Sequence, residues 1–503
     1  MSDGHSREEI LAALRAEETA VVATHGGGGE IRTRKMHYVA ADDFSIYLAS
    51  MKADPKTVQI AYHPTVSLLV YNRGERLADS SEVEISGRAV QVGEESEREE
   101  AFAKLGEVSP VVKHLVEASN AEILEVIKVI PTLIKYRVFR EITQGIPPTV
   151  FEFREREAEV GLGEPALLYR KLKIWWMELR PSFLIATLIP LLLGAVIAWA
   201  NTGTLLWPYL LLTLLGGLLL HGGTNMINDY FDHKSRNDEL NREFVRPFSG
   251  GSRMIQLGLL TPLEVLCASL LCFGLGSSIG AYLAWARGPL ILALGLVGTV
   301  SGFFYTAPPF RFADRGVGEL LVGLNFGVLM TLGSYFVQAQ RLDWEPLLAA
   351  LPVTFLIMAV LYINEFPDYE ADKAVGKATL IVRLGRERAI LGYIAIMSAT
   401  YLALGLGALS GAVSPYAALG LLSLPLALKG VCYARAYYER PFELVPANAS
   451  TIMAHLLTGA LLVAGYILER LGPRGLPGLL PLGLATGLII WWLHRHIEGQ
   501  KRA

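Results

Sequence analysis

From about residue 165 onward, apolar runs of about 20 residues follow one another with few charged residues inside them. A helix of that length is what is needed to cross the hydrocarbon core of a bilayer. We expect ten spans, at about residues 182–200, 205–227, 262–286, 288–305, 317–338, 346–364, 389–411, 414–434, 449–469 and 476–494. The sequence therefore predicts an all-α, polytopic transmembrane helix bundle.

The part of the chain before these runs is charged and has short β-type runs separated by glycine-rich or polar turns. The predicted strands are Thr19–Thr24, Ile31–Val39, Phe44–Ala49, Val66–Tyr71, Val83–Val92 and a last one around Ile134–Phe139. Ser6-x-x-Glu9 has the form of a capping box and predicts a first helix. Many short strands in about 140 residues suggest a small antiparallel β-barrel, so we expect a multidomain chain with an α+β barrel first.

A connecting region lies between the two parts. Residues 151–163 are charged and lack a strong period, which is typical of a linker. Residues 167–180 interleave basic side chains with Trp175 and Trp176, which suggests an interfacial helix on an anionic membrane surface. The predicted boundaries are therefore 1–150 for the barrel, 151–180 for the linker and interfacial helix, and 181–503 for the membrane bundle.

Positive charge predicts the orientation. Met1–Glu18 has no apolar core resembling a signal peptide, so we place the N-terminus in the cytoplasm. The loops on the opposite side then carry few basic residues, namely Arg287, Arg341, Arg470 and Arg474, whereas the cytoplasmic loops carry many. We expect a multi-pass protein of the cytoplasmic (inner) membrane, with the barrel on the cytoplasmic side.

Two acidic segments follow apolar runs and fall on that same side. Asp229 and Asp232 are three residues apart, and Asp368 and Asp372 are four apart, so on a helix each pair shares a face. Carboxylates at a membrane helix end are costly unless cations neutralise them, and Mg2+ typically binds through one or two carboxylates plus substrate phosphates. One such cluster could equally be a solvated, helix-capping loop. Two clusters, each with an Asn just upstream, favour a shared diphosphate–magnesium site.

The residues at these segments resemble a known family. Asn225-x-x-Asn228-Asp229-x-x-Asp232 and Asp368-x-x-x-Asp372 resemble the two aspartate-rich motifs of the UbiA-type intramembrane aromatic prenyltransferases, and the resemblance covers roughly residues 172–470. Further matching stretches are Arg180–Ser182, Arg246-Pro247, Ser249–Arg253, Tyr305–Pro309, Gly316–Glu319 and Lys373–Lys377. Many members have a third aspartate where this chain has Arg236. Asp238 would serve instead, a spacing that resembles the branch prenylating 1,4-dihydroxy-2-naphthoate in menaquinone synthesis.

The resemblance implies Mg2+-dependent transfer of a polyprenyl group from polyprenyl diphosphate to an aromatic quinone precursor. The acceptor that it favours is 1,4-dihydroxy-2-naphthoate, as in menaquinone biosynthesis. The alternatives within this class are 4-hydroxybenzoate, homogentisate, a tetrapyrrole or a glyceryl ether as acceptor. A flavin-linked membrane transporter or redox sensor is a different class, but transporter sites lie near the midplane rather than at the boundary. We expect the two substrates and the lipid bilayer as partners, and no nucleic acid. The sequence does not fix the length of the prenyl tail or the oligomeric state, and a homo-oligomer is one of the open alternatives.

The resemblance also implies roles for individual residues. Asp229, Asp232, Asp238, Asp368 and Asp372 would hold the metal, with Asn228 as a neutral oxygen ligand or positioning group. Tyr305 would steer the acceptor, although a tyrosine of the interfacial belt is equally consistent. The expected substrate-binding residues are Arg180, Asn225, Arg246, Arg253, Asn364, Lys373 and Lys377. For the basic ones, and for Lys377 above all, the alternative is the positive-inside signal itself. His221 is expected to make an interhelical contact.

The barrel portion is similar to the flavin-binding split-barrel family of pyridoxamine phosphate oxidases. The matching stretches are Ile31–Met36, Ile46–Lys52, Asp54–Thr57, Val66–Tyr71 and Ile85–Ala89. By that resemblance, FMN would be bound through its phosphate by basic and hydroxyl side chains, and the candidates are Arg34, Ser50, Lys52, Lys56 and Thr57. The alternative is a solvated basic loop, or a barrel without a cofactor.

Overall fold

The computed structural model describes residues 5–26, 30–52, 54–118, 120–153, 164–241, 245 and 248–501. The chain forms two compact units. The first runs to Trp175 and includes Leu257–Thr261; the second consists of Trp176–Gln256 and the chain from Pro262 onward. Each is described by itself.

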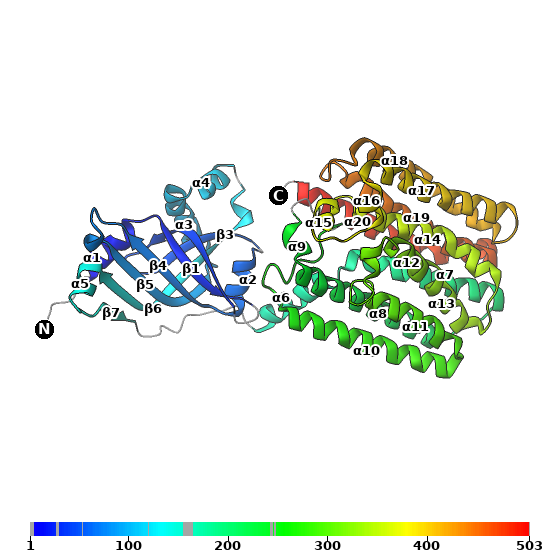
Figure 1. Ribbon diagram of the computed structural model, residues 1–503, viewed down its shortest axis with the longest axis horizontal. Helices are drawn as coiled ribbons and strands as arrows, with labels where there is room; N and C mark the ends of the chain where they lie inside the picture. The colour runs from blue at the N-terminus through cyan, green and yellow to red at the C-terminus, as the bar shows by residue number, and fades with distance from the viewer. Residues whose placement is uncertain are drawn as a thin grey trace. The chain divides into compact units, whose positions relative to one another are not determined.

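The first unit is built on a closed antiparallel barrel (Figure 1). The strands run in the order β3-β2-β1-β4-β5-β6, and the barrel closes because β3 also pairs with β6. A seventh strand, β7, pairs with the far end of β6. The bounds are β1 Thr19–His25, β2 Ile31–Ala40, β3 Ile46–Met51, β4 Thr65–Asn72, β5 Ser81–Gln91, β6 Leu124–Val138 and β7 Thr149–Glu152. Alternate residues point inward, and Ile46, Leu48 and Val70 are fully buried. The predicted barrel is confirmed.

Helices cover parts of this barrel. Their bounds are α1 Arg7–Arg15, α2 Pro55–Tyr62, α3 Glu95–Val108, α4 Pro110–Glu117 and α5 Phe139–Thr143. The capping box before α1 is confirmed, because the Glu9 N–H donates to the Ser6 hydroxyl and the Ser6 N–H donates to the Glu9 carboxylate. The last large strand is longer than predicted and begins ten residues before Ile134, at Leu124. Pro131 lies inside it, where the β5–β6 register shifts, and a bulge of this kind tolerates the missing N–H.

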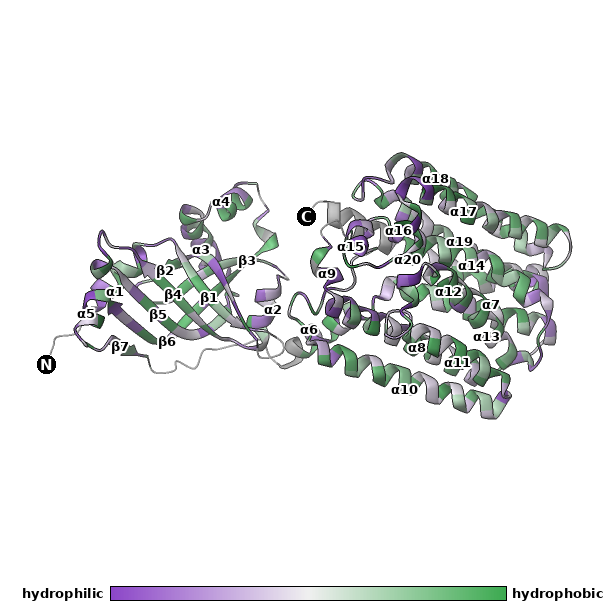
Figure 2. Ribbon diagram, viewed as in Figure 1, coloured by the Kyte–Doolittle hydropathy of each residue, from purple (hydrophilic) through white to green (hydrophobic). Residues whose placement is uncertain are grey.

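The second unit is helical, and its long helices are hydrophobic along most of their length (Figure 2). The helices are α6 Glu164–Glu178 (shared with the first unit), α7 Pro181–Thr202, α8 Trp207–Ser235, α9 Asn237–Leu240, α10 Pro262–Arg287, α11 Leu290–Phe303, α12 Gly318–Gly323, α13 Met330–Ala339, α14 Trp344–Asn364, α15 Tyr369–Ala374, α16 Leu380–Leu384, α17 Arg386–Leu409, α18 Leu424–Tyr437, α19 Val445–Leu471 and α20 Leu476–Lys501. A π-helical segment, η4 Leu324–Leu329, joins α12 to α13, and the 3-10 segment η5 Pro415–Ser423 leads into α18.

Eight helical segments of the described chain are long and apolar enough to cross a membrane. They correspond to eight of the ten expected spans. The remaining two expectations, 288–305 and 476–494, correspond to shorter apolar helices, Leu290–Phe303 and Leu479–Trp491. A 14-residue helix such as α11 rises only about 21 Å, which is less than the hydrocarbon core of a typical bilayer.

The central helices pack closely at small residues. Gly194 of α7 lies directly against α13, and a Cβ atom added there would be 2.2 Å from the Thr331 carbonyl oxygen. Only glycine permits this approach, because the neighbouring atom belongs to the backbone and cannot rotate away. The α7–α13 contact therefore depends on Gly194.

We expect Gly194→Val to destabilise the helical unit by about 1–3 kcal/mol, the usual cost of overpacking. Gly274→Val is the matched control, because Gly274 lies on an exposed face of α10 and a Cβ atom there has no neighbour within 4 Å in the described part of the chain. Thermal unfolding in one detergent should show a lower Tm for Gly194→Val than for the control. Equal Tm values for the two variants would contradict this packing.

Candidate active site

A cavity of about 340 Å3 lies inside the helical unit. Residues on one face of α8 line it, beginning at Thr213 and ending at Asp232. At 1.5 Å per residue this stripe is roughly 28 Å long. Its far end is apolar, where Leu283, Ile291 and Val337 border the cavity, and its near end carries the acidic motifs. The cavity is therefore a long apolar chamber with a charged mouth.

The first acidic motif contributes differently at each position. Asp232 and Asp238 line the cavity. Asp229 is 2% exposed, and its Oδ2 accepts the N–H of Ser252 at 2.9 Å. Arg180 is next to it, with Nη1 4.0 Å from Asp229 Oδ1, and itself lines the cavity. Asp229 thus anchors the loop that carries Ser252.

That loop passes very close to the carboxylates at Gly251. A Cβ atom on Gly251 would be 3.0 Å from Asp229 Oδ1 and 3.2 Å from Asp238 Oδ2, and its φ of +68° is in the left-handed region. Glycine is the residue that accepts both conditions.

The second acidic motif faces the same cavity, through Asp368 and Asp372. The two asparagines that flank Asp238 donate to the second motif: Asn237 Nδ2 to Asp372 Oδ1 at 3.0 Å, and Asn241 Nδ2 to Asp368 Oδ1 at 2.6 Å. Segments that are more than 120 residues apart in the chain are therefore joined by direct hydrogen bonds.

Lys377 lies between the two motifs. Its Nζ is 3.8 Å from Asp232 Oδ1 and 3.7 Å from Asp372 Oδ1, and the side chain lines the cavity. Burial disfavours the ammonium ion, but Asp232 and Asp372 outweigh it and raise the pKa of Lys377 well above its usual range. Lys377 is therefore a buried cation at the mouth of the cavity.

Two carboxyl groups at the mouth of the cavity, those of Asp238 and Asp372, have raised pKa values. Burial, followed by the charges of Asp232 and Asp229, raises the pKa of Asp238 well above its usual range. Burial raises the pKa of Asp372 to about 7, with Asp368 adding to the effect and Lys377 opposing it. These carboxylates repel one another in a poorly solvated place, and a bound cation would relieve that repulsion.

The oxygen ligands at this mouth fit Mg2+. Within the described part of the chain, no group of three or more His, Cys, Asp or Glu side chains is close enough to hold a metal ion by itself. Mg2+ in nucleotide and diphosphate sites uses one or two carboxylates and completes its shell with phosphate oxygens and water. Asn228 Oδ1 and Asp229 Oδ1 are also buried and have no hydrogen-bond partner among the residues that the structure describes. The residues present therefore suit an ion that arrives with a diphosphate.

The structure places the other predicted residues as follows. Asn225, Asn228, Tyr305 and Asn364 line the cavity. Arg253 is not among its lining residues; its Nη1 donates to the Asn241 carbonyl oxygen at 3.4 Å. Lys373 is exposed and stacks over the Tyr369 ring, away from the cavity lining. Arg246 lies outside the described residues.

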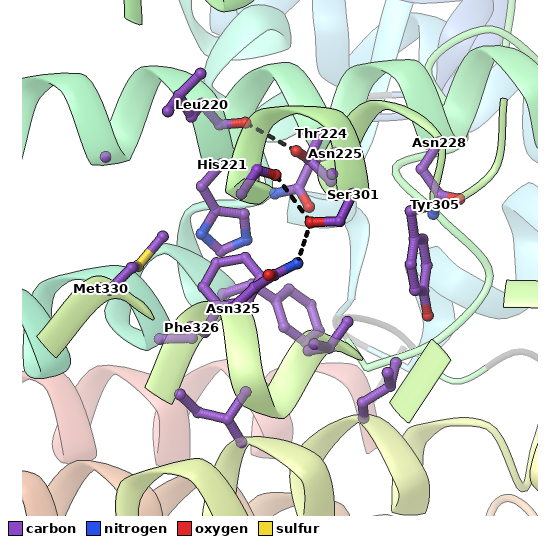
Figure 3. A pocket seen from close by; sticks show the side chains of 18 of the residues that line it. Leu220, His221, Thr224, Asn225, Asn228, Ser301, Tyr305, Asn325, Phe326 and Met330 are labelled. Carbon is purple, nitrogen blue, oxygen red and sulfur yellow. Dashed lines mark hydrogen bonds between the residues drawn. The ribbon is translucent and has the colours of Figure 1, made fainter. Parts of the chain in front are cut away.

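The wall of the cavity also has polar groups at membrane depth (Figure 3). His221 Nδ1 is 2.8 Å from Thr187 Oγ1, which confirms the expected interhelical contact. Asn325, from the π-helical segment, donates to Ser301 Oγ at 2.7 Å. Sequence reasoning did not single out Asn325 or Ser301, although a polar residue within an apolar run is a signal that could have found them.

Two asparagines and two glutamates at the mouth were also missed. Asn237 and Asn241 flank Asp238 at helical spacing, and Glu365 directly follows Asn364, so their position in the motifs was a usable signal. Glu319 ends the matching stretch Gly316–Glu319, but its position next to the second motif is purely spatial and had no sequence signal.

In the barrel, the predicted phosphate ligands come from β2, β3 and the start of α2. Arg34 donates to Thr24 Oγ1 at 2.8 Å and to Gln59 Oε1 at 3.0 Å, which connects β2 to α2. Lys56 Nζ is 2.7 Å from Asp54 Oδ2, and Thr57 donates to the Asp54 carbonyl oxygen. Ser50, the last residue but one of β3, is almost fully buried, and Lys52 follows the strand in an exposed turn. Cationic and hydroxyl groups of this kind suit a phosphate.

Comparison with known proteins agrees with both units. The model of the UbiA prenyltransferase family matches residues 187–445, just over half of the chain. The pyridoxamine 5'-phosphate oxidase model matches residues 6–135. The 1,4-dihydroxy-2-naphthoate octaprenyltransferase of Bacillus subtilis is 28% identical over 59% of this chain and 93% of its own length. The enzyme of the same name from Mycobacterium tuberculosis is 31% identical over 58% and 96%. The 2-carboxy-1,4-naphthoquinone phytyltransferase of Synechocystis is 27% identical over 60% and 95%.

A helical membrane bundle with two acidic motifs at the mouth of one apolar cavity, matched by these relatives, defines a membrane-embedded prenyltransferase. The chain belongs to the UbiA prenyltransferase family and is a multi-pass membrane protein, with a pyridoxamine 5'-phosphate oxidase-like barrel at its N-terminus.

Proposed function

We propose that the protein transfers a polyprenyl group from polyprenyl diphosphate to an aromatic quinone precursor, in an Mg2+-dependent reaction, with 1,4-dihydroxy-2-naphthoate as the acceptor. The observation that carries this proposal is the meeting of the two acidic motifs at one cavity, joined by Lys377, Asn237 and Asn241. The choice of acceptor is supported by relatives named for naphthoate or naphthoquinone substrates.

The residues of the mouth would bind the diphosphate. Lys377 and Arg180 supply positive charge, and Asp232, Asp368 and Asp372 would hold Mg2+ against the phosphate oxygens, with Asp238 alongside. Bound there, Mg2+ would neutralise the diphosphate as it leaves. Asp229 would act indirectly, by fixing the Gly251–Ser252 loop beside the other carboxylates.

The apolar part of the cavity would take the isoprenoid tail. Gly280, Gly295, Gly298 and Gly333 line it, and a Cβ atom on any of them would meet open space. Burial of the tail supplies binding free energy, and the same walls exclude the water that would trap an allylic cation. Tyr305 and Asn364, at the level of the acidic motifs, would orient the acceptor ring.

The direct test of the proposal is a product assay. Membranes containing the protein are incubated with labelled polyprenyl diphosphate, Mg2+ and a panel of acceptors: 1,4-dihydroxy-2-naphthoate, 4-hydroxybenzoate, homogentisate, a tetrapyrrole and a glyceryl ether. We expect a prenylated naphthalene whose mass shows loss of the carboxyl group. A product formed only from a different acceptor would replace 1,4-dihydroxy-2-naphthoate as the proposed substrate. If no acceptor gives a product, the proposed function is refuted.

We propose that both acidic motifs and the barrel lie on the cytoplasmic side. After Cys267, Cys272 and Cys432 are changed to serine, single cysteines at Ser235 and Ala374 should react with an impermeant thiol reagent from the cytoplasmic side only. Cysteines at Thr204 and Leu342 should react from the opposite side. Labelling of Ser235 and Ala374 from different sides would contradict a shared site.

We propose that the barrel binds FMN through Arg34, Ser50, Lys52, Lys56 and Thr57. Full-length protein purified in mild detergent should then show flavin absorbance, and Arg34→Ala with Lys56→Ala should weaken FMN binding at least about 10-fold, since two charge-assisted bonds are lost. Arg88→Ala with Lys113→Ala is the control, because both residues are exposed on the same unit. Protein that is colourless and takes up no added FMN would refute this assignment.

A further inference from the structure

Glu365 is a buried carboxyl group that the metal site does not use. It follows Asn364 at the C-terminal end of α14, is 8% exposed and lines the cavity. Its Oε2 is buried and has no hydrogen-bond partner within the described part of the chain. Lys377, the neighbouring cation, is engaged by Asp232 and Asp372 instead.

Glu319 lies behind Glu365 and is even more buried, at 1% exposed. Its Oε1 accepts the N–H of Leu380 at 2.8 Å, which fixes the side chain, while Oε2 has no partner among the described residues. Burial, followed by the charge of Glu319, raises the pKa of Glu365 well above its usual range. Glu365 lines the cavity and Glu319 does not, so Glu319 stands on the side of Glu365 that is away from the cavity.

Tyr305 borders the same part of the site. A Cβ atom on Gly318, the residue before Glu319, would lie 3.1 Å from the Tyr305 hydroxyl oxygen, and Tyr305 lines the cavity together with Glu365. The wall at this point therefore presents an aromatic ring with a hydroxyl group from one segment and a carboxyl group from another. Such a surface suits a flat ring that carries hydroxyl groups.

The unpartnered oxygen argues for a ligand. A buried polar atom without a partner costs free energy, and a purely structural position would be better filled by an apolar side chain of the same size. A ring hydroxyl would satisfy Glu365 in either protonation state. An ionised carboxylate accepts a hydrogen bond from the hydroxyl, and a protonated carboxyl group can donate or accept one.

We propose that Glu365 is the hydrogen-bond partner of a ring hydroxyl of the aromatic acceptor, and that Glu319 is the positioning residue that holds it there. This specificity-determining role rests on the proposed function, since it assumes an aromatic acceptor in this cavity. It assigns acceptor recognition to the pair Glu319–Glu365, and diphosphate binding to Lys377 and the aspartates.

The test measures binding separately from turnover. Equilibrium binding of 1,4-dihydroxy-2-naphthoate, its two monohydroxy analogues and 2-naphthoate to the full-length protein in detergent is followed by naphthalene fluorescence. The variants are Glu365→Leu, Glu365→Gln and Glu319→Gln, with Glu370→Gln as the control, because Glu370 is exposed in the same motif. Gel filtration of each variant checks that it is folded, and Kd for polyprenyl diphosphate is measured in parallel.

We expect the natural chain to bind at least one hydroxylated naphthoate about 10- to 100-fold more tightly than 2-naphthoate. In Glu365→Leu this preference should fall to less than about 3-fold, with Glu365→Gln and Glu319→Gln intermediate, while Kd for polyprenyl diphosphate stays within about 3-fold. Glu370→Gln should match the natural chain.

The inference is overturned if the hydroxyl preference persists in Glu365→Leu or if the natural chain has no such preference. It is also overturned if Glu365→Leu weakens the binding of the hydroxylated naphthoates and of polyprenyl diphosphate equally. Prenyl transfer is assayed on the same preparations, so the two proposals can fail separately. Transfer with an unchanged hydroxyl preference in Glu365→Leu refutes only the role of Glu365. Hydroxyl-dependent binding without transfer to any acceptor refutes the proposed function and leaves a binding site for hydroxylated rings.

Discussion

Asp368→Asn should lower kcat for prenyl transfer by at least about 10²–10³-fold, the range seen when one charge-stabilising group is removed from an active site. The amide keeps an oxygen for Asn241, whose Nδ2 donates to Asp368 Oδ1, so the local structure should survive. What is lost is one negative charge at the mouth of the cavity, and with it the affinity for a divalent cation. Turnover of purified variants at saturating substrates measures the effect.

Glu370→Gln is the control for this prediction, since Glu370 is two residues away but exposed. Chelation of divalent ions should abolish transfer by the natural chain, and added Mg2+ should restore it. Asp368→Asn should require a higher Mg2+ concentration for whatever activity remains. Near-normal turnover of Asp368→Asn at ordinary Mg2+ would show that the second motif is not part of the metal site.

Lys377→Met should lower kcat/KM for polyprenyl diphosphate by about 10²–10³-fold. The ammonium group is within 4 Å of a carboxylate of each motif and is a buried cation next to the proposed diphosphate position. Its removal leaves Asp232 and Asp372 less compensated and takes away a phosphate contact. Steady-state kinetics with the diphosphate as the varied substrate measures this loss.

Lys373→Met is the matched control, because Lys373 is four residues earlier, exposed, and absent from the cavity lining. Both lysines contribute equally to the positive charge of their loop. If that charge were their only role, the two variants would behave alike. A large loss confined to Lys377→Met would assign Lys377 to the diphosphate site. Equal kinetics of the two variants would mean that Lys377 serves only as a positive charge that sets membrane orientation.

Several features of this protein could be predicted from sequence because they depend on local pattern. A run of about 20 apolar residues predicts a span wherever the chain carries it, and eight such segments are long helices in the described chain. Alternation and turn residues predicted the barrel, and Ser6-x-x-Glu9 predicted the start of α1. Pro131 concealed the first half of β6, because a proline inside a strand normally indicates its end.

The sequence by itself determined which residue types could bind a diphosphate and a cation: paired aspartates at the ends of apolar runs, with asparagines and lysines nearby. It did not determine how they are used. Asp229 and Asp232 belong to one motif, yet Asp229 binds the Ser252 N–H while Asp232 faces the cavity. Lys373 and Lys377 are equivalent as loop charges, yet only Lys377 contacts Asp232 and Asp372 in the described structure.

Only the tertiary structure decided that α8 and α14 bring the two motifs to one cavity, and that Glu319 stands behind Glu365. The physical reason is that helical periodicity specifies which face of a helix is apolar, but not which other helix that face meets. Contacts such as Gly194 against Thr331, or Asn241 against Asp368, form between segments far apart in the chain, and they depend on the packing of the whole bundle.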